Sequence, residues 1–143
     1  MSADPLVELR RTYRFCASHR VARSDWSEAR NMEVYGPASY ASGHGHNYRL
    51  TLVLAGVPDP ETRRIVDLEA LDLAIEEAVL LPFDHKNLNA DVPSLAGEVP
   101  TSEVLVVDIW NRVAPCIPGG ALREVILETD EFLAARYRGP KGA

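Results

Sequence analysis

The stretch "HGHNYRLTLVLAGV", residues 44–57, decides the fold of this chain. Side chains of a β-strand alternate between two faces, so every second residue of the stretch lies on the same side. One face would carry His44, His46, Tyr48, Leu50, Leu52 and Leu54. The stretch therefore predicts a long, half-buried strand that begins with two histidines on its apolar face.

A second alternating stretch precedes it, over residues 6–20. Its apolar face would carry Leu9, Arg11, Tyr13, Phe15, Ala17 and His19. We expect this strand to be antiparallel to the next one if the two pair. The connection, residues 21–43, is too long for a simple turn. It is expected to hold a short helix that is capped by Ser24 or Asp25 and ends at Gly36.

The period changes to a helical one after Asp67, which is a good N-cap. One helix is expected to run from there to Pro82, and a second to run from "PTSE" to Pro115. Residues 121–139 then predict two strands joined by a turn at Asp130-Glu131. The order ββααββ indicates an α+β domain, residues 1–143, with an antiparallel sheet and helices on one face. So small a sheet has exposed edges, and pairing with another subunit removes them, so we expect a homo-oligomer.

Composition limits the function classes. The chain has 143 residues, 46% hydrophobic and 25% charged, as in an ordinary globular protein. Its net charge of −6 argues against a nucleic-acid surface. The first ten residues carry Asp4 and Glu8 and no apolar core, so no signal peptide is expected. No apolar run approaches the ~18 residues of a membrane span, so no membrane segment is expected either. Two distant cysteines, Cys16 and Cys116, form no disulfide framework and favour a cytoplasmic location.

The histidines predict a metal site. His44 and His46 are two apart on one strand face, with Cα atoms roughly 6.5 Å apart, and His19 ends the neighbouring strand. Three neutral imidazoles with an open fourth position are typical of a catalytic zinc site. Zinc is the first candidate, while iron, nickel and copper stay open on ligand type alone.

Two acidic positions have alternative interpretations. Asp84 beside His85 either tunes an imidazole for proton transfer or only caps a helix end. Glu128 ends a strand, on the expected face of Leu122, Glu124 and Ile126. It is either solvated or held in a pocket, where its carboxylate could bind a guanidine-like edge of a heterocycle.

Five motifs in order carry a family resemblance: "FCASHR", "GHGHNY", "FDHKNLN", "PTSE" and "LETD". Over residues 11–139 the chain resembles the 6-pyruvoyltetrahydropterin synthase and 6-carboxytetrahydropterin synthase family. The resemblance implies the tunnelling fold, a four-stranded antiparallel sheet with two helices between strands two and three. It also implies trimers that close a barrel and pair into hexamers, with active sites between subunits.

The resemblance also implies site roles. His19, His44 and His46 would hold zinc, and the pterin substrate would be 7,8-dihydroneopterin triphosphate. Asp84, His85 and Glu128 would be catalytic, the first two as a proton relay to which Glu128 is linked. Glu128 would also anchor the pterin ring, and the other substrate-binding residues would be Thr101, Ser102 and Glu103.

The chain departs from the family at Ala38, where members with this loop length usually carry a cysteine whose thiolate is the base. The hydroxyls of Ser39, Tyr40 and Ser42 have ordinary pKa values far above neutral. Cys16, by alternation, points to the face opposite His19.

Four interpretations of the function stay open. The family reaction could use Asp84–His85 or Glu33 as base. The chain could instead cleave a dihydroneopterin side chain by a retro-aldol reaction to a 6-hydroxymethyl pterin. It could bind pterin without turnover, or Ala38 could be an engineered substitution. The product could serve tetrahydrobiopterin-like cofactors, deazapurine-modified tRNA (queuosine) or folate supply.

Overall fold

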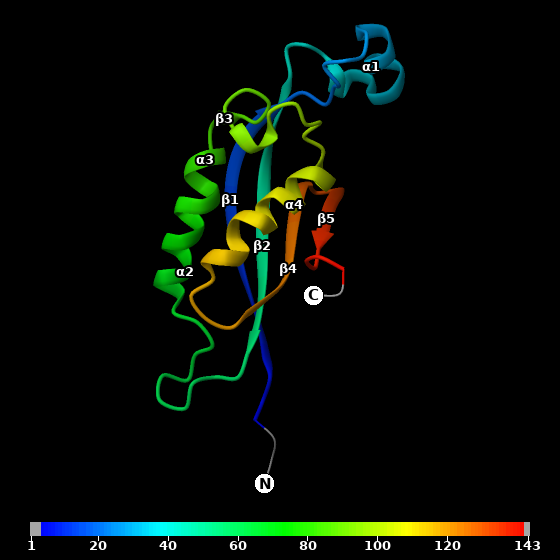
Figure 1. The fold of residues 1–143 in the computed structure, drawn as a ribbon. Coiled ribbons are helices and arrows are strands. Elements are labelled where there is room, and N and C mark those ends of the chain that lie inside the picture. Colours follow the sequence, from blue (N-terminus) through cyan, green and yellow to red (C-terminus); the bar gives the residue numbers. More distant parts are fainter. Residues whose placement is uncertain (1–3, 142–143) are drawn as a thin grey trace.

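The computed structural model describes residues 4–141, which build one sheet with helices against one face (Figure 1). The strands lie in the order β3-β1-β2-β4-β5. Their bounds are β1 Val7–His19, β2 His44–Gly56, β3 Lys86–Asn87, β4 Ala121–Asp130 and β5 Leu133–Tyr137. The two predicted N-terminal strands are confirmed to within one residue at each end.

β1 and β2 form an antiparallel ladder that runs from Val7 opposite Gly56 to His19 opposite His44. Because the two strands alternate in the same register, their apolar faces coincide, as at Phe15 opposite Tyr48. These two rings stack, with centroids 4.9 Å apart. Leu50, Leu52 and Leu54 are fully buried on this face, and burial of each such side chain stabilises the fold by about 1.5–3 kcal/mol. The ladder is therefore paired and packed up to the end that carries the histidines.

One helical run covers this face beside β1. It consists of α2 (Leu68–Ile75), a π-helical turn (Glu76–Leu80) and α3 (Leu81–Phe83). Asp67 is the N-cap, as predicted, and its carboxylate accepts from the backbone N–H groups of Glu69 and Ala70. The prediction that Pro82 ends the helix is wrong, because the run continues to Phe83. Proline has no N–H to donate to the carbonyl four residues back. That carbonyl, of Ala78, instead accepts a 3.3 Å hydrogen bond from the Arg112 guanidinium.

Two further helices complete the described chain. α4 (Ser102–Val113) begins at its N-cap Thr101 and packs against the sheet, and it ends two residues before Pro115. α1 (Glu28–Tyr35) lies in the long connection and ends at Gly36, as predicted. Its N-cap, however, is Ser27, whose hydroxyl accepts from the Arg30 N–H at 3.1 Å. The prediction that Ser24 or Asp25 caps this helix is therefore wrong, and the Asp25 carboxylate instead accepts from the Arg23 guanidinium.

The expected four-stranded antiparallel sheet is corrected to a five-stranded mixed sheet. The short strand β3 pairs with β1 in parallel, at Ala17 opposite Lys86 and Ser18 opposite Asn87. Two residues are too few to produce an alternation that a sequence pattern could reveal. β3 lies between the two predicted helical runs, and backbone bonds from His85 N–H to Cys16 C=O and from Leu88 N–H to Ser18 C=O hold it in place.

β4 departs from simple alternation through a bulge opposite Val53 and Leu54. Because of the extra residue, Leu122 packs against the core while Glu124 lies on the opposite face with Arg136 and Arg138. The expectation that Leu122 shares a face with Glu124, Ile126 and Glu128 is therefore wrong for Leu122. The β4–β5 turn falls at residues 131–132, one position later than predicted, and the Asp130 carboxylate accepts from the Phe132 N–H.

No helix between residues 4 and 141 combines the length and the apolar character needed to cross a membrane. The expected oligomer stays a prediction.

Candidate metal centre and proton-transfer group

The three predicted histidine ligands converge at the end of the β1–β2 ladder. His19 lies directly opposite His44, and His46 follows two residues along the same face. One ring nitrogen of each lies within 4.8 Å of the other two. The Nε2 atoms of His19 and His44 are 3.1 Å apart. Gly43 permits this arrangement, because its φ of +71° is left-handed and a Cβ there would lie 3.1 Å from the His19 carbonyl oxygen.

Burial favours the neutral, metal-binding form of two of these imidazoles, His19 and His46. His19 is only 4% exposed, and its Nδ1 lies 2.8 Å from the Pro100 carbonyl oxygen. A carbonyl only accepts hydrogen bonds, so Nδ1 carries the hydrogen and Nε2 keeps its lone pair. Burial lowers the pKa of His19 to about 4, although the bond to Pro100 opposes this. Burial also lowers the pKa of His46, and His44 adds to that effect.

This geometry fits a divalent ion. Two nitrogens bound tetrahedrally at about 2.0–2.1 Å from one zinc ion lie roughly 3.3–3.4 Å apart, close to the separation of the two Nε2 atoms. Within the described part of the chain, this group contains three ligand side chains and no fourth. The donor set therefore suits an imidazole-binding metal with a position left open for a substrate or water.

A second ionisable group lies at the same end of the sheet, where the predicted pair Asp84 and His85 meets Cys16. Asp84 Oδ2 lies 3.0 Å from His85 Nδ1, and the backbone N–H of Cys16 donates to Asp84 Oδ1 at 2.9 Å. The Cys16 N–H is the main cause that lowers the pKa of Asp84, and the His85 ring and the Cys16 thiol contribute too. An ionised carboxylate thus orients the imidazole, as a proton-transfer role requires.

Sequence reasoning missed the place of Cys16 in this group. Alternation correctly predicted that Cys16 faces away from His19. What the pattern could not show is that the chain after α3 returns to β1 on that side and brings Asp84 and His85 with it. The returning backbone is anchored at Cys16, whose N–H and C=O bind Asp84 and His85 respectively. A motif "FDH" that follows a helix end gives no signal of such a partner.

Glu128 lies apart from this group in the single chain. It faces Arg49 across the β2–β4 ladder, with a 4.0 Å ion pair, on the sheet face away from the histidine rings. Its side chain is 39% exposed. It lines a hollow of about 340 Å³ together with Arg14, Asn47, Tyr48, Arg49, Asp130 and Glu131. The carboxylate is thus accessible to a ligand, and the structure does not bring it to Asp84–His85.

The "PTSE" residues connect these parts. Besides the Pro100 carbonyl that orients His19, the Thr101 side chain caps α4 by accepting from the Val104 N–H. Ser102 is buried, and its hydroxyl lies 2.5 Å from that of Thr129, the neighbour of Glu128. Glu103 is exposed on the first turn of α4. The motif therefore links the His19 end of β1 to the Glu128 end of β4.

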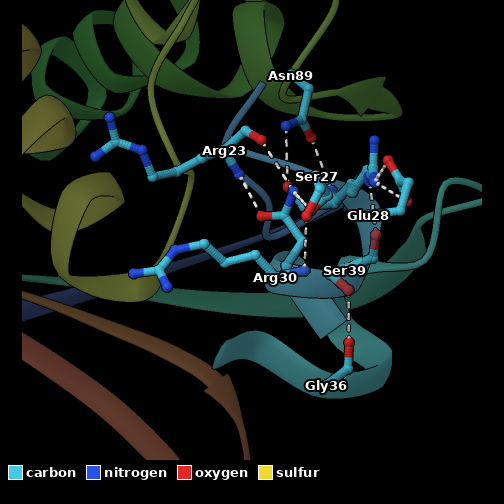
Figure 2. Close-up of polar contacts among 9 residues, drawn as sticks. Arg23, Ser27, Glu28, Arg30, Gly36, Ser39 and Asn89 are labelled. Atoms are coloured by element: carbon cyan, nitrogen blue, oxygen red, sulfur yellow. Dashed lines mark hydrogen bonds and ion pairs between the residues drawn. The ribbon is translucent and has the colours of Figure 1, made fainter. Parts of the chain in front are cut away.

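The connection that carries Ala38 is tied down by polar contacts (Figure 2). Arg20 is their centre: its Nε donates to the Ser39 carbonyl at 2.6 Å and its Nη2 donates to both oxygens of Glu28 at 2.8 Å. The Ala38 carbonyl accepts from the Val21 N–H at 2.9 Å. Glu33, the other candidate base, is exposed on α1 and belongs to neither ionisable group of the described residues.

Comparisons with known proteins agree with this arrangement. The family model of 6-pyruvoyl tetrahydropterin synthase matches residues 8–140. The 6-pyruvoyl tetrahydrobiopterin synthase of Poecilia reticulata is 39% identical over 96% of this chain and 93% of its own length. The Homo sapiens protein of the same name is 37% identical, over 93% and 92% of the two chains.

Among solved structures, the 6-pyruvoyl tetrahydropterin synthase of Caenorhabditis elegans superposes with a TM-score of 0.91 at 30% identity. The match covers 98% of this chain and all of that one. The fold described above is therefore the tunnelling fold, and the short strand β3 is an addition to the expected elements. Fold, motifs and comparisons together show that the chain belongs to the 6-pyruvoyl tetrahydropterin synthase family.

Proposed function

We propose that this protein is a zinc-dependent carbon–oxygen lyase that acts on 7,8-dihydroneopterin triphosphate and forms 6-pyruvoyltetrahydropterin. The observation that carries the proposal is the convergence of three imidazoles, from His19, His44 and His46, in a chain of this family. Relatives that share 37–39% of its residues are named as synthases of this type.

The metal, when bound, would polarise the hydroxyl oxygens of the substrate side chain and acidify the adjacent C–H bonds. The three histidines would hold it and leave one side of it free. Removal of a carbon-bound proton then requires a base that exchanges protons near neutral pH. The imidazole of His85, which the Asp84 carboxylate orients, is solvent-accessible and would take part in this proton transfer.

Glu128 would anchor the pterin ring. A carboxylate can accept two parallel N–H bonds from the amino-pyrimidine edge of a pterin. The ion pair with Arg49 at 4.0 Å is long, so it leaves the Glu128 oxygens free to accept such bonds. Thr101, Ser102 and Glu103 would support this subsite, because the Ser102–Thr129 contact fixes the backbone next to Glu128.

The active site would be shared between subunits of a hexamer built from two trimers. β1 has no strand partner on its outer edge before Ala17 among the residues that the structure describes. Phe132 and Leu133 at the β4–β5 turn are exposed apolar side chains. If the β1 edge of one copy paired with the β4–β5 side of a second copy, the unpaired edge and the exposed apolar side chains would both be covered. The same pairing would bring Asp84–His85 of one copy to the histidines and Glu128 of another.

Ala38 favours a second candidate, retro-aldol cleavage of a dihydroneopterin side chain to a 6-hydroxymethyl pterin. A methyl group stands where relatives with this loop length usually carry the thiol, and retro-aldol cleavage depends more on metal polarisation. A binder without turnover is less well supported, because the Asp84–His85 pair has no role in holding the metal or the ring.

A product assay distinguishes these functions. The zinc-loaded protein is incubated with 7,8-dihydroneopterin triphosphate, and pterins and inorganic triphosphate are separated and quantified. Release of triphosphate with equal formation of 6-pyruvoyltetrahydropterin supports the proposal. A 6-hydroxymethyl pterin with an aldehyde fragment supports the second candidate. Tight binding of unchanged substrate would overturn both.

A further inference from the structure

The group Cys16–Asp84–His85 offers the thiol that the loop lacks. We propose that Cys16 is the proton-accepting residue of this chain's reaction, activated by the His85 imidazole that Asp84 orients. This inference rests on the proposed lyase function, which requires a base, and it names a residue for which neither the motifs nor the fold family provides a role.

The geometry joins three ionisable side chains from two segments far apart in sequence. The Cys16 sulfur, a His85 ring nitrogen and an Asp84 oxygen all lie within 4.8 Å of one another. The backbone fixes the group from both sides, since Cys16 donates its N–H to Asp84 and accepts from the N–H of His85 at 2.6 Å. His85 has a φ of +59°, a left-handed conformation that costs a non-glycine residue about 1–2 kcal/mol. The fold therefore holds the imidazole beside the thiol against a local backbone preference.

The group is also accessible. Cys16 and His85 line a hollow of about 430 Å³, and Gly45, His46 and Asn47 of β2 line it with them. A partly exposed thiol next to an imidazole is the arrangement in which cysteines become reactive. Lys86 also lines the hollow, and its positive charge favours the thiolate.

Cys116 shows what an ordinary cysteine of this chain looks like. It is exposed after α4, and its thiol donates to the Arg112 carbonyl at 3.4 Å. It belongs to neither ionisable group of the described residues. The two cysteines thus form a matched pair, one beside an imidazole–carboxylate pair and one without it.

The proposed step transfers two protons. The Cys16 S–H proton passes to the free nitrogen of His85, which gives a thiolate and an imidazolium facing the ionised Asp84. The thiolate would then take a proton from a side-chain carbon of the substrate that bears a hydroxyl group, and it would become a thiol again. The electron pair of that C–H bond would pass to the adjacent C=N bond of the dihydropterin ring, and the imidazolium proton would be available for return to another substrate atom.

The position of the hollow sets a condition on the substrate. Cys16 and the histidine rings lie on opposite faces of the β1–β2 ladder, although Cys16 pairs with Asn47, the residue after His46. A substrate held at the histidines must therefore reach past the open edge of β1, or meet the thiol of a second copy paired to that edge. In both arrangements the substrate would reach the thiol through the hollow that Cys16 and His85 line.

Thiol reactivity tests the inference without any substrate. Zinc-loaded wild-type protein is alkylated with iodoacetamide from pH 5 to pH 9, and the rates at Cys16 and Cys116 are followed separately by peptide mass spectrometry. We expect Cys16 to react at least ~10-fold faster than Cys116 at pH 6.5, and His85→Ala to remove most of this advantage. Equal rates at the two cysteines, or a Cys16 rate that His85→Ala leaves unchanged, would overturn the proposal.

Turnover provides the second test. We expect Cys16→Ser and Cys16→Ala to lower kcat about 10²–10⁴-fold with KM little changed, and the Cys116→Ser control to stay within about twofold of wild type. A Cys16 variant with unaltered kcat would overturn the inference while the lyase proposal stands. The same holds if wild type binds two zinc ions per chain and Cys16→Ser binds one, because Cys16 would then be a metal ligand. If wild type shows no lyase product, the proposed function fails, and the alkylation rates still decide whether the thiol is activated.

Discussion

The two ionisable groups at one end of the sheet differ in almost every physical respect. The histidine group (His19, His44 and His46) lies on the core face, with His19 buried, and faces a backbone carbonyl and aromatic rings. The thiol group (Cys16, Asp84 and His85) lies on the opposite face, in an open hollow. Burial suppresses protonation and favours metal binding, whereas exposure beside a carboxylate suits proton exchange. One strand ladder thus separates the proposed metal site from the proposed proton-transfer site.

The largest expected effect comes from removing one histidine. His44→Ala should lower zinc affinity about 10³-fold or more, because two imidazoles remain of three. His85→Ala, the matched control from the other group, should keep about one zinc per chain but lose about 10²–10⁴-fold in turnover. Metal analysis after dialysis and the product assay measure the two quantities. If both variants lose metal equally, the two groups are not separate.

The buried hydroxyl pair of Ser102 and Thr129 belongs to the buried side of the molecule, on which the histidine group also lies. Ser102→Ala leaves the Thr129 hydroxyl without its partner and should cost about 1–3 kcal/mol of unfolding free energy. The double variant Ser102→Ala/Thr129→Val should recover much of that loss, because both polar groups are gone. Urea unfolding measures this. If the double variant lost more unfolding free energy than the two single variants lose together, the expectation would be contradicted.

Strain at His85 separates its structural role from its chemical one. Glycine adopts a φ of +59° freely, so His85→Gly should be more stable than His85→Ala by about 1 kcal/mol, although both lack the imidazole. Thermal unfolding of the two variants, side by side, measures the difference. Equal stabilities would mean that the backbone at this position is not strained.

Acid should weaken the thiol group before it unfolds the core. The Cys16 N–H, His85 and the thiol hold the pKa of Asp84 below its usual value. A carboxyl of this kind contributes stability above its unfolded-state pKa and loses it as the pH falls through the lower folded-state pKa. Because the Asp84 side chain is 40% exposed, the contribution should stay below ~1 kcal/mol. Asp84→Asn should therefore flatten the unfolding free energy between pH 5 and pH 2 slightly, and a steeper dependence would contradict this sign.

The smallest expected effect concerns Tyr48, which packs beside His19 and His46. Among the described residues, its hydroxyl is the one fully buried side-chain polar atom without a hydrogen-bond partner. Tyr48→Phe should therefore leave the unfolding free energy unchanged or raise it by up to ~1 kcal/mol. A loss of more than ~1 kcal/mol, measured by urea unfolding, would show that the hydroxyl has a partner such as bound water.

How far the sequence could predict this molecule depended on local periodicity. The alternation around His44 and His19 predicted both strands, their pairing and the convergence of the three histidines. The strand β3, the bulge before Glu124 and the Ser27 cap were missed, because each rests on one or two residues whose conformation tertiary contacts decide. The place of Cys16 was missed for the same reason. Its partners Asp84 and His85 are 68 and 69 residues away, and only the return of the chain to β1 joins them.

The central claim, that the histidine group holds one metal ion on which turnover depends, is tested most directly by zinc titration. Metal-free protein receives increasing zinc, and bound zinc and the rate of triphosphate release from 7,8-dihydroneopterin triphosphate are measured on the same samples. We predict that the rate rises in proportion to bound zinc and levels off at about one ion per chain, with His44→Ala inactive throughout. Full turnover in the metal-free protein, or no turnover at any zinc content, would contradict the account.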